Sequence, residues 1–379
     1  MRHWIFVLLT VALMSICGRA QSRADLTAEQ TALHTATFQA ATKAHQAGRH
    51  DEAIAGFIKC LELVAEDDAT AYNIACGYSQ KHEVDQAFAW LTKAIAWGFG
   101  ANNLDVDLVA MAEKTDPDLD LLRTDPRFAA ALLAIKANAK AVDDYVNAPL
   151  FYVPESCKGA QSLGVLVLLH ERGSTREELL DSAWKKLADE LHLALVLPSG
   201  RMPVRAQPRQ GMSWFSSLPN YTKSTWKYER TVGEALATFG KLHTLDKQRV
   251  FIGGLGQGGM VAFNIAIAAP TTYSGVLVFD SPLVQAAAAP KSAAAAKQGF
   301  RGRVYVNTTK LFAVPPGTDM LKYVQAIEKG IASLKLEGLR LSTYELDPAQ
   351  PEQRTQLALG TLREWLETPL VPPNPPAAK

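Results

Sequence analysis

VFIGGLGQGG, residues 250–259, is the segment that says most about how this chain folds. Its first three residues are apolar and suit a buried strand, and glycines then crowd the turn that follows. Residues 260–268 are small or apolar and have the length of a helix. Because glycine permits tight turns, the segment predicts a strand, a sharp turn and a helix in direct succession.

Apolar strands and amphipathic stretches alternate on both sides of this turn, from about Leu150 onward. The strand candidates are residues 164–169, 193–197, 249–252, 275–279, 303–306 and 341–345. The helix candidates are residues 175–191, 228–242, 260–268, 320–336 and 352–366. This alternation predicts an α/β fold with a mostly parallel sheet and helices on both of its faces.

The composition bounds the function. With 379 residues, 48% hydrophobic and 20% charged, the chain suits a globular protein of two domains. Removing Arg2 and Arg19 with a leader peptide leaves 37 basic against 38 acidic side chains, a net charge of about −1. Such a balance gives no overall attraction to nucleic acid or to an anionic membrane, so neither is an expected partner.

The first 20 residues look like a signal peptide. Arg2 precedes an apolar run at residues 5–14, and Gly18-Arg-Ala20 places small residues at the −3 and −1 cleavage positions. The run is shorter than the ~20 residues that span a bilayer. A lipoprotein site at Cys17 is the weaker alternative, because the bulky Ile16 precedes it. We expect export to the periplasm or the medium, with no integral membrane segment in the mature chain.

An internal repeat lies in the N-terminal part, which we assign to residues 21–147. Ala41, Ala44, Ala53, Phe57 and Cys60 recur 34 residues later as Ala75, Tyr78, Ala87, Leu91 and Ala94. The period resembles that of tetratricopeptide repeats, and residues 104–128 resemble the capping segment of a short array. A third helix is expected at residues 127–147. The repeats predict either a surface for a peptide or protein partner or a packing module.

Residues 148–368 resemble the α/β-hydrolase superfamily, in particular its phospholipase/carboxylesterase and acyl-thioesterase branch. That branch carries Gly-Phe-Ser-Gln-Gly-Gly where this chain has Gly254-Leu-Gly-Gln-Gly-Gly259. Residues 165–172 (VLVLLHER) resemble its strand and oxyanion loop, and residues 211–215 (GMSWF) resemble a further motif of the branch.

The resemblance implies a catalytic triad that this chain does not have. Gly256 stands at the nucleophile position, and glycine has no side chain to form an acyl-enzyme. The base should follow the nucleophile in the chain, but His243 is the last histidine and Gln350 stands at the base position. Leu311 or Lys310 stands at the acid position. Because the triad works as a unit, no ordinary serine-hydrolase mechanism is expected.

A binding pocket can outlast the triad, because the oxyanion hole of this fold uses backbone N–H groups. The resemblance assigns these donors to Gln257 and to Glu171 or Arg172, and Trp214 is a candidate to line the same crevice. We therefore predict an exported, non-catalytic binding or scaffolding protein. Its expected ligand is a small carbonyl or carboxylate compound.

Two enzymatic or cofactor-binding alternatives stay open. Ser281 and His170 each follow a strand and should reach the same sheet edge, so they could form a displaced nucleophile and base of an esterase or thioesterase. Residues 254–259 also match the dinucleotide pattern G-x-G-x-x-G, with Asp280 at the position of a ribose-binding acid. Only two convincing strands follow Asp280, fewer than a full dinucleotide domain needs.

Neither a metal nor a cofactor is expected. No histidine lies at a metal-ligand spacing from a cysteine, and no His-Glu-x-x-His sequence occurs. Cys60, Cys76 and Cys157 cannot all pair, so disulfides do not form the framework. Residues 285–298 are of low complexity and suggest a surface loop, and residues 369–379 form a proline-rich tail.

Overall fold

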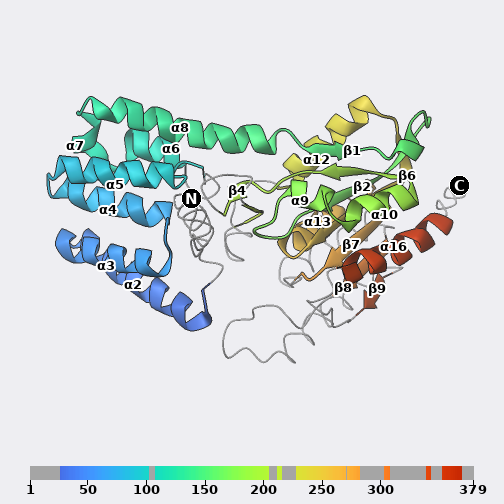
Figure 1. Cartoon of the computed structure of the whole chain (residues 1–379), viewed down its shortest axis with the longest axis horizontal. Coiled ribbons are helices and arrows are strands. Elements are labelled where there is room, and N and C mark those ends of the chain that lie inside the picture. Colours follow the sequence, from blue (N-terminus) through green and yellow to red (C-terminus); the bar gives the residue numbers. More distant parts are fainter. Residues whose placement is uncertain are drawn as a thin grey trace, which may run out of the picture. The chain divides into compact units, whose positions relative to one another are not determined.

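The computed structural model describes residues 26–101, 107–204, 211–215, 228–269, 271–281, 303–307, 339–342 and 352–368. The chain divides into two compact units (Figure 1). One contains the residues up to Phe99 together with Asp116–Ala131, and the other contains Gly100–Thr115 and everything from Leu132 onward. The expected leader and the proline-rich tail lie outside the described residues.

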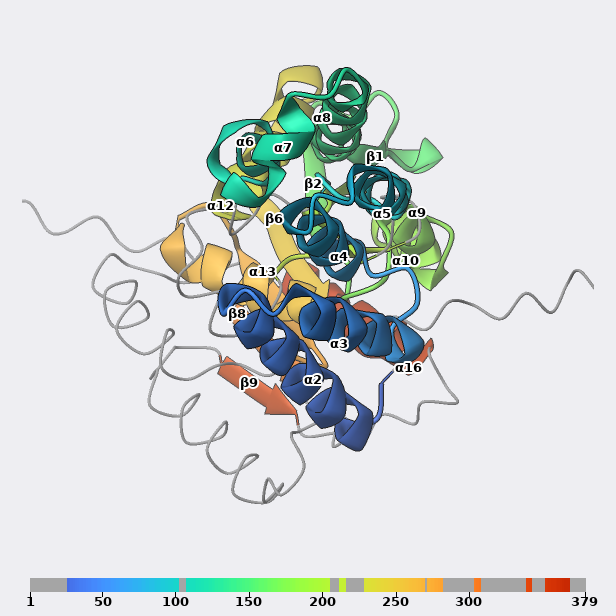
Figure 2. The same cartoon turned by 90° about the vertical axis from the view of Figure 1, so that its left-hand side faces the viewer.

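The first unit is helical, as predicted. Its main helices are α2 (Ala28–Gln46), α3 (His50–Leu63), α4 (Asp68–Gln80) and α5 (Val84–Ala96). Each of them packs on the next along the chain (Figure 2). Small residues permit this close packing: a Cβ added to Gly56 would lie 2.8 Å from the Ala41 Cβ, and one on Gly77 would lie 2.8 Å from the Ile54 side chain. Ala53, Ala87 and Leu91 have no exposed surface.

Short helical turns follow, where the sequence suggested a capping segment. They are α6 (Leu108–Ala110), η2 (Met111–Thr115), η3 (Pro117–Leu119) and α7 (Asp120–Arg123), and the long helix α8 (Arg127–Val146) comes next. The Asp116 carboxylate accepts a hydrogen bond of 2.7 Å from the Tyr72 hydroxyl and thereby ties this segment to α4. The C-terminal part of α8 belongs to the second unit, where Tyr145 and Val146 join a buried cluster with Met212.

A seven-stranded sheet forms the centre of the second unit, in the order β1-β3-β2-β6-β7-β8-β9. The strands are β1 (Leu150–Tyr152), β2 (Leu163–Leu169), β3 (Leu193–Leu197), β6 (Leu245–Leu255), β7 (Gly275–Phe279), β8 (Arg303–Asn307) and β9 (Leu339–Ser342). All pairings are parallel except that of the edge strand β1 with β3. A separate antiparallel pair consists of β4 (Met202–Pro203) and β5 (Met212–Ser213). The predicted mostly parallel sheet is confirmed.

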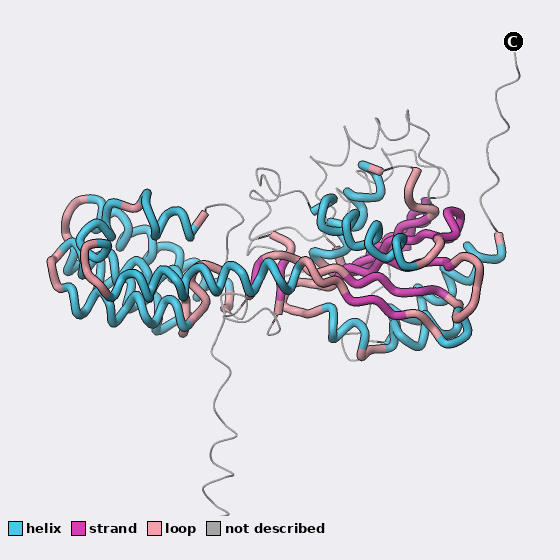
Figure 3. Tube along the Cα trace, turned by 90° about the horizontal axis from the view of Figure 1, so that it is seen from above, coloured by secondary structure: helices cyan, strands magenta, loops and turns pink. Residues whose placement is uncertain are grey.

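Helices cover both faces of this sheet, also as predicted (Figure 3). They are α9 (Arg176–Leu180), α10 (Ala183–Leu191), α12 (Tyr228–Leu242), α13 (Gln257–Ala268) and α16 (Glu352–Glu367). Alternate residues of each strand point to opposite faces. Thus Val167 and Ile252 share one buried cluster with α12 and α13, while Leu168 and Phe251 share the other with α10 and α16.

Several element boundaries differ from the predicted ones: β9 lies at Leu339–Ser342 instead of residues 341–345, and α13 begins at Gln257 instead of residue 260. Strand β6 begins at Leu245 instead of residue 249, and β1 was not predicted. The single helix expected at residues 175–191 is divided into α9 and α10, because the Ser182 side chain accepts a hydrogen bond from the Trp184 N–H and starts a new helix. The predicted helix 320–336 and the loop 285–298 lie outside the described residues.

Two further expectations concern cysteines and membranes. Cys60, Cys76 and Cys157 are all buried and carry free thiols. Among the helices of the described residues, none combines the length and the apolar character needed to cross a bilayer.

Candidate functional site

The glycine turn forms a sharp elbow between β6 and α13. Gly256 has φ 52° and ψ −120°, a backbone conformation that favours glycine, and its N–H donates a hydrogen bond of 2.9 Å to the carbonyl oxygen of Phe279. Gly254 must also be glycine, because a Cβ there would lie 2.3 Å from the carbonyl carbon of Gly258. The strand, turn and helix predicted from the sequence are confirmed.

The carboxyl ends of three neighbouring strands bring the predicted site residues together. Strands β2, β6 and β7 are adjacent and parallel, so the residues that follow them meet at one edge of the sheet. A Cβ added to Gly256 would lie 3.2 Å from the Cβ of Glu171, which follows β2. A Cβ added to Gly259 would lie 3.0 Å from the Cβ of Ser281, which follows β7.

His170 lies at this edge, but both nitrogens of its ring are hydrogen-bonded to backbone groups. Its Nε2 accepts a hydrogen bond of 2.9 Å from the Gly200 N–H, and its Nδ1–H donates one of 2.7 Å to the carbonyl oxygen of Glu171. The ring is fully buried, and this burial lowers the pKa of His170 to about 4. His170 is therefore neutral, and neither ring nitrogen is available to take a proton from Ser281.

Trp214 and Gln257 support the elbow from the inside. The Trp214 indole has no exposed surface, donates a hydrogen bond of 2.8 Å to the His170 carbonyl oxygen and stacks on the His170 ring. The Gln257 Oε1 accepts hydrogen bonds from the Ser213 hydroxyl at 2.7 Å and the Trp214 N–H at 3.1 Å. Its Nε2 donates to the Phe215 carbonyl oxygen at 3.1 Å. Trp214 thus lies in the core, and the Gln257 side chain fastens residues 213–215 to α13.

The side chains described above are hydrogen-bonded, but a backbone donor predicted for the oxyanion hole is not. Gln257 is the first residue of α13, and its N–H forms no hydrogen bond to any other residue that the structure describes. The first N–H groups of a helix are free to bind an external acceptor. Glu171 is half-buried beside the elbow, while Arg172 is exposed.

Carboxylates dominate the charge around the elbow. Burial raises the pKa of Glu171, and the nearby Asp280 and Glu178 raise it further, whereas Arg354 opposes them. Asp280 is itself buried and adopts a positive φ of 50°, and its carboxylate forms an ion pair with Arg354 of α16. The Ser281 hydroxyl is fully buried and has no hydrogen-bond partner among the described residues.

Several residues named from the sequence do not join this group. Leu311, Lys310 and Gln350, the positions of the acid and the base, lie outside the described residues. His243 follows α12 and precedes the first residue of β6, at the end of the strand opposite to the elbow. The roles of Arg354 and Gly200 were not predicted, because they depend on contacts with residues 74 and 30 positions away in the chain.

Comparison with known proteins gives one family match. Residues 156–329 match the Phospholipase/Carboxylesterase family. Among curated proteins none matches this chain.

Solved structures of low sequence identity also match. Esterase PE8 is 19% identical with a TM-score of 0.42, and the match covers 57% of this chain and 98% of that one. An S-formylglutathione hydrolase from Agrobacterium tumefaciens is 17% identical with a TM-score of 0.43, covering 57% and 88%. A phospholipase/carboxylesterase from Dyadobacter fermentans DSM 18053 is 16% identical with a TM-score of 0.40, covering 57% and 95%. The family match over residues 156–329 and the mostly parallel sheet with its elbow are consistent with an α/β-hydrolase fold for this domain.

Proposed function

We propose that this protein is an exported pseudo-hydrolase, which binds a ligand at the elbow but does not cleave it. The observation that carries the proposal is Gly256: the backbone turns as a nucleophile elbow does, yet the residue has no side chain. Without a nucleophilic atom at this position, no acyl-enzyme can form there.

The residues that the structure describes also offer no base for acyl transfer at the elbow. The chain has no histidine after His243. His170 reaches the correct edge of the sheet, but both of its ring nitrogens are hydrogen-bonded to backbone groups. Ser281 has no exposed surface from which to attack a substrate. A serine hydrolase needs its serine and its base in contact, so this arrangement supports binding without turnover.

The groups at the elbow favour a neutral carbonyl ligand. The free N–H of Gln257, at the positive end of the α13 dipole, suits a carbonyl oxygen. Glu171 and Asp280 lie close by and would repel a carboxylate, although the sequence allowed either ligand. We therefore propose an ester or amide that is held at the elbow and left intact.

The helical unit is proposed as the surface for a peptide or protein partner. Two large apolar side chains are exposed on its first two helices, Leu33 of α2 at 56% and Ile58 of α3 at 37%. Exposed apolar side chains on a helical-repeat scaffold are a common basis for partner binding. The packing module remains the simpler alternative.

Two alternatives, an esterase with a displaced nucleophile and a dinucleotide-binding protein, have less support than the pseudo-hydrolase. The family match is compatible with an esterase that uses Ser281, but the bonded ring of His170 leaves that serine without a base. The glycines of the dinucleotide pattern are explained by packing, since Gly254 and Gly258 touch the backbone of the turn and of β2. Asp280 pairs with Arg354 and is not free for a ribose hydroxyl.

The test is labelling of the full chain, without its leader, by a fluorophosphonate probe, together with hydrolysis of p-nitrophenyl butanoate. We expect neither labelling nor turnover from the natural sequence. Gly256→Ser should also remain inactive, because it restores a hydroxyl but no base. The new Cβ would lie 3.2 Å from the Glu171 side chain, and the positive φ of residue 256 strains any residue other than glycine, so circular dichroism must verify the fold.

Stoichiometric labelling of the natural sequence would overturn the proposal. If labelling disappeared in Ser281→Ala, the displaced-nucleophile alternative would be correct. Ligand binding is tested separately by NMR titration with butanamide and with butanoate. The proposal predicts that the amide shifts the Gln257 amide resonance and that the carboxylate does so more weakly.

A further inference from the structure

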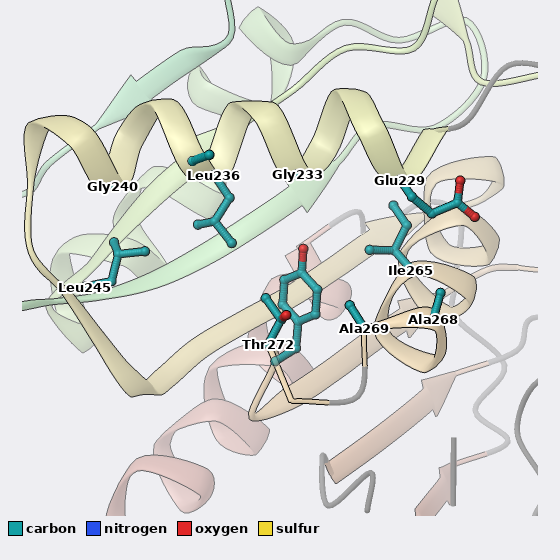
Figure 4. Close-up of a pocket in the computed structure, with 11 residues that line it drawn as sticks. Glu229, Gly233, Leu236, Gly240, Leu245, Ile265, Ala268, Ala269 and Thr272 are labelled. Atoms are coloured by element: carbon teal, nitrogen blue, oxygen red, sulfur yellow. The ribbon is translucent and has the colours of Figure 1, made fainter. Parts of the chain in front are cut away.

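A groove lies at the other end of β6, away from the elbow. It has a volume of about 410 Å³ and is lined by α12, the first residue of β6 and the C-terminal end of α13 with the turn that follows (Figure 4). Leu245 begins the 11-residue strand and Gly256 follows its end, so about 35 Å of extended chain separates groove and elbow. The groove is thus a different place from the site proposed above.

The walls of the groove are apolar and leave room for an occupant. Leu236 of α12 and Ile265 of α13 point into the space between the two helices (Figure 4). Gly233, Ala237 and Gly240 lie on the same face of α12, and a Cβ added to Gly233 would meet no atom within 4 Å. The volume falls in the range of small-molecule pockets.

An unpartnered phenol distinguishes this groove from a gap between side chains. Tyr273 lines it and is 5% exposed. Its hydroxyl forms no hydrogen bond with the residues that the structure describes, and burial raises the pKa of Tyr273 so that the group stays neutral. The ring of Tyr273 is buried, but its hydroxyl oxygen is not one of the enclosed oxygen atoms without a partner, so it is accessible from the groove. The hydroxyl is therefore available for a hydrogen bond with an occupant of the groove.

The charge of the groove selects among possible occupants. Glu229 in the first turn of α12 is the one charged residue among the eleven that line it. No ion pair joins Glu229 to another residue in the described part of the chain. Figure 4 places Glu229 at one end of α12 and Gly240 with Leu245 at the other. At 1.5 Å per residue, Glu229 and Gly240 are about 16 Å apart along the helix, with apolar surface between them.

We propose that this groove binds an amphipathic primary amine. The hydrocarbon part lies along Leu236, Ile265 and Leu245, and the ammonium group donates hydrogen bonds to the Glu229 carboxylate and the Tyr273 hydroxyl. Each feature has one role: the apolar walls hold the chain, the carboxylate fixes the sign of the head group, and the phenol orients it. The proposal is independent of whether the elbow binds a ligand or cleaves one.

The test is isothermal titration of the full chain, without its leader, with decylamine and with decanoate, both below their aggregation concentrations. These compounds share an apolar chain and differ in the charge of the head group. We expect saturable binding of decylamine and at least tenfold weaker binding of decanoate. Glu229→Gln should reduce this preference, and Tyr273→Phe should weaken decylamine binding several-fold.

A substitution that fills the groove tests most directly whether decylamine binds there. Gly233→Leu places a large side chain where no atom lies within 4 Å, and it should abolish decylamine binding. Gly360→Leu is the matched control, because Gly360 is also an exposed helical glycine with no atom near its added Cβ and lies on α16. This control should bind as the natural sequence does.

Absence of saturable binding would overturn the proposal, and so would equal binding of decanoate. If Gly233→Leu bound decylamine as strongly as Gly360→Leu, the amine would be adsorbed elsewhere on the protein. Circular dichroism shows whether each variant is folded. Should Gly233→Leu fail to fold, the surface variant Glu229→Gln still decides, because the proposal requires it to lose affinity for the amine.

Discussion

The two ends of strand β6 differ in how their polar groups are used. At the elbow, His170, Trp214 and Gln257 all direct their side-chain polar atoms to defined hydrogen-bond partners. At the groove, the Tyr273 hydroxyl is accessible from the groove and has no partner among the described residues. A hydrogen-bonded buried group contributes to stability, whereas a polar group that water reaches contributes little and is available to a ligand.

This difference shows that a preserved scaffold is poor evidence for a preserved reaction. The hydrogen bonds around the elbow hold its shape whether or not residue 256 carries a nucleophile, so the architecture can persist without the chemistry. The groove differs in that its polar groups, Glu229 and the Tyr273 hydroxyl, are accessible and unbonded among the described residues, and no architecture there marks an enzyme. At the elbow, the Ser281 hydroxyl is also unbonded among the described residues, but it is fully buried. The predictions below test this contrast by comparing how substitutions at each end of β6 change the free energy of unfolding.

The largest effect is expected from Trp214→Ala. The indole is fully buried, stacks on His170 and donates a hydrogen bond to its carbonyl oxygen. Truncating a buried aromatic side chain leaves a cavity, so the free energy of unfolding should fall by about 3–5 kcal/mol. Urea denaturation measures it. Leu242→Ala, at a side chain that is 65% exposed, is the control and should change stability by less than about 0.5 kcal/mol. A loss below about 1 kcal/mol for Trp214→Ala would mean that the elbow is not the tight scaffold described here.

The second effect is a pH dependence caused by His170. Its pKa is about 4 in the folded protein and 6.5 in the unfolded chain, so between these values only the unfolded chain takes up the proton. The free energy of unfolding should therefore fall as the pH decreases from 6.5 to 4, by up to about 3 kcal/mol. Above pH 6.5 this contribution is constant, because the ring is neutral in both states.

His170→Gln isolates this term. The glutamine side chain is long enough to accept the hydrogen bond that Gly200 donates to Nε2, but it has no ionisable ring. The raised pKa of Glu171 gives the opposite slope above its unfolded value of 4.5, because the folded protein then keeps its proton longer than the unfolded chain. Since both proteins carry Glu171, the difference between their unfolding curves at pH 7, 5.5 and 4.5 reports His170 alone. Parallel curves would show that His170 is not held neutral.

Much of the fold is predictable from the sequence, because strands and helices follow from local patterns. The buried strand β3 was predicted at its observed residues, 193–197, and β7 at 275–279. The parallel order of the strands then brings Glu171, Gly256 and Ser281 to one edge. What could not be predicted are the partners of each side chain. His170 and Ser281 reach the same edge, and only the hydrogen bonds to Gly200 and Glu171 show that the imidazole is already occupied.

The groove was missed for the same reason. Gly233 and Gly240 look like ordinary helix-weakening residues in the sequence, and Tyr273 looks like a core aromatic residue. Their relation depends on the packing of α12 against α13, which joins parts of the chain about 30 residues apart. Gly360 shows that an exposed helical glycine alone carries no information about a site, since it is equally uncrowded but does not line this groove.

An intermediate effect is expected from Gln257→Ala. Its side chain makes hydrogen bonds to the Ser213 hydroxyl, the Trp214 N–H and the Phe215 carbonyl oxygen. Removing it leaves the Trp214 N–H without this acceptor, so unfolding should become easier by about 1–3 kcal/mol. Gln248→Ala, at an exposed position of β6, is the matched control and should have almost no effect. Equal effects of the two substitutions would contradict the structural role of Gln257.

The smallest change in the free energy of unfolding is expected from Tyr273→Phe, and it distinguishes the groove from the elbow most clearly. Tyr273→Phe removes a hydroxyl that has no partner among the described residues, so the free energy of unfolding should change by less than about 0.5 kcal/mol. Tyr145→Phe is the comparison, because the Tyr145 hydroxyl donates a hydrogen bond of 2.5 Å to Glu177 and its loss should cost about 1–2 kcal/mol. Thermal unfolding with and without decylamine completes the test: the amine should stabilise the natural sequence more than Tyr273→Phe. If Tyr273→Phe alone proved as costly as Tyr145→Phe, its hydroxyl would serve the fold, and the contrast between elbow and groove would fail.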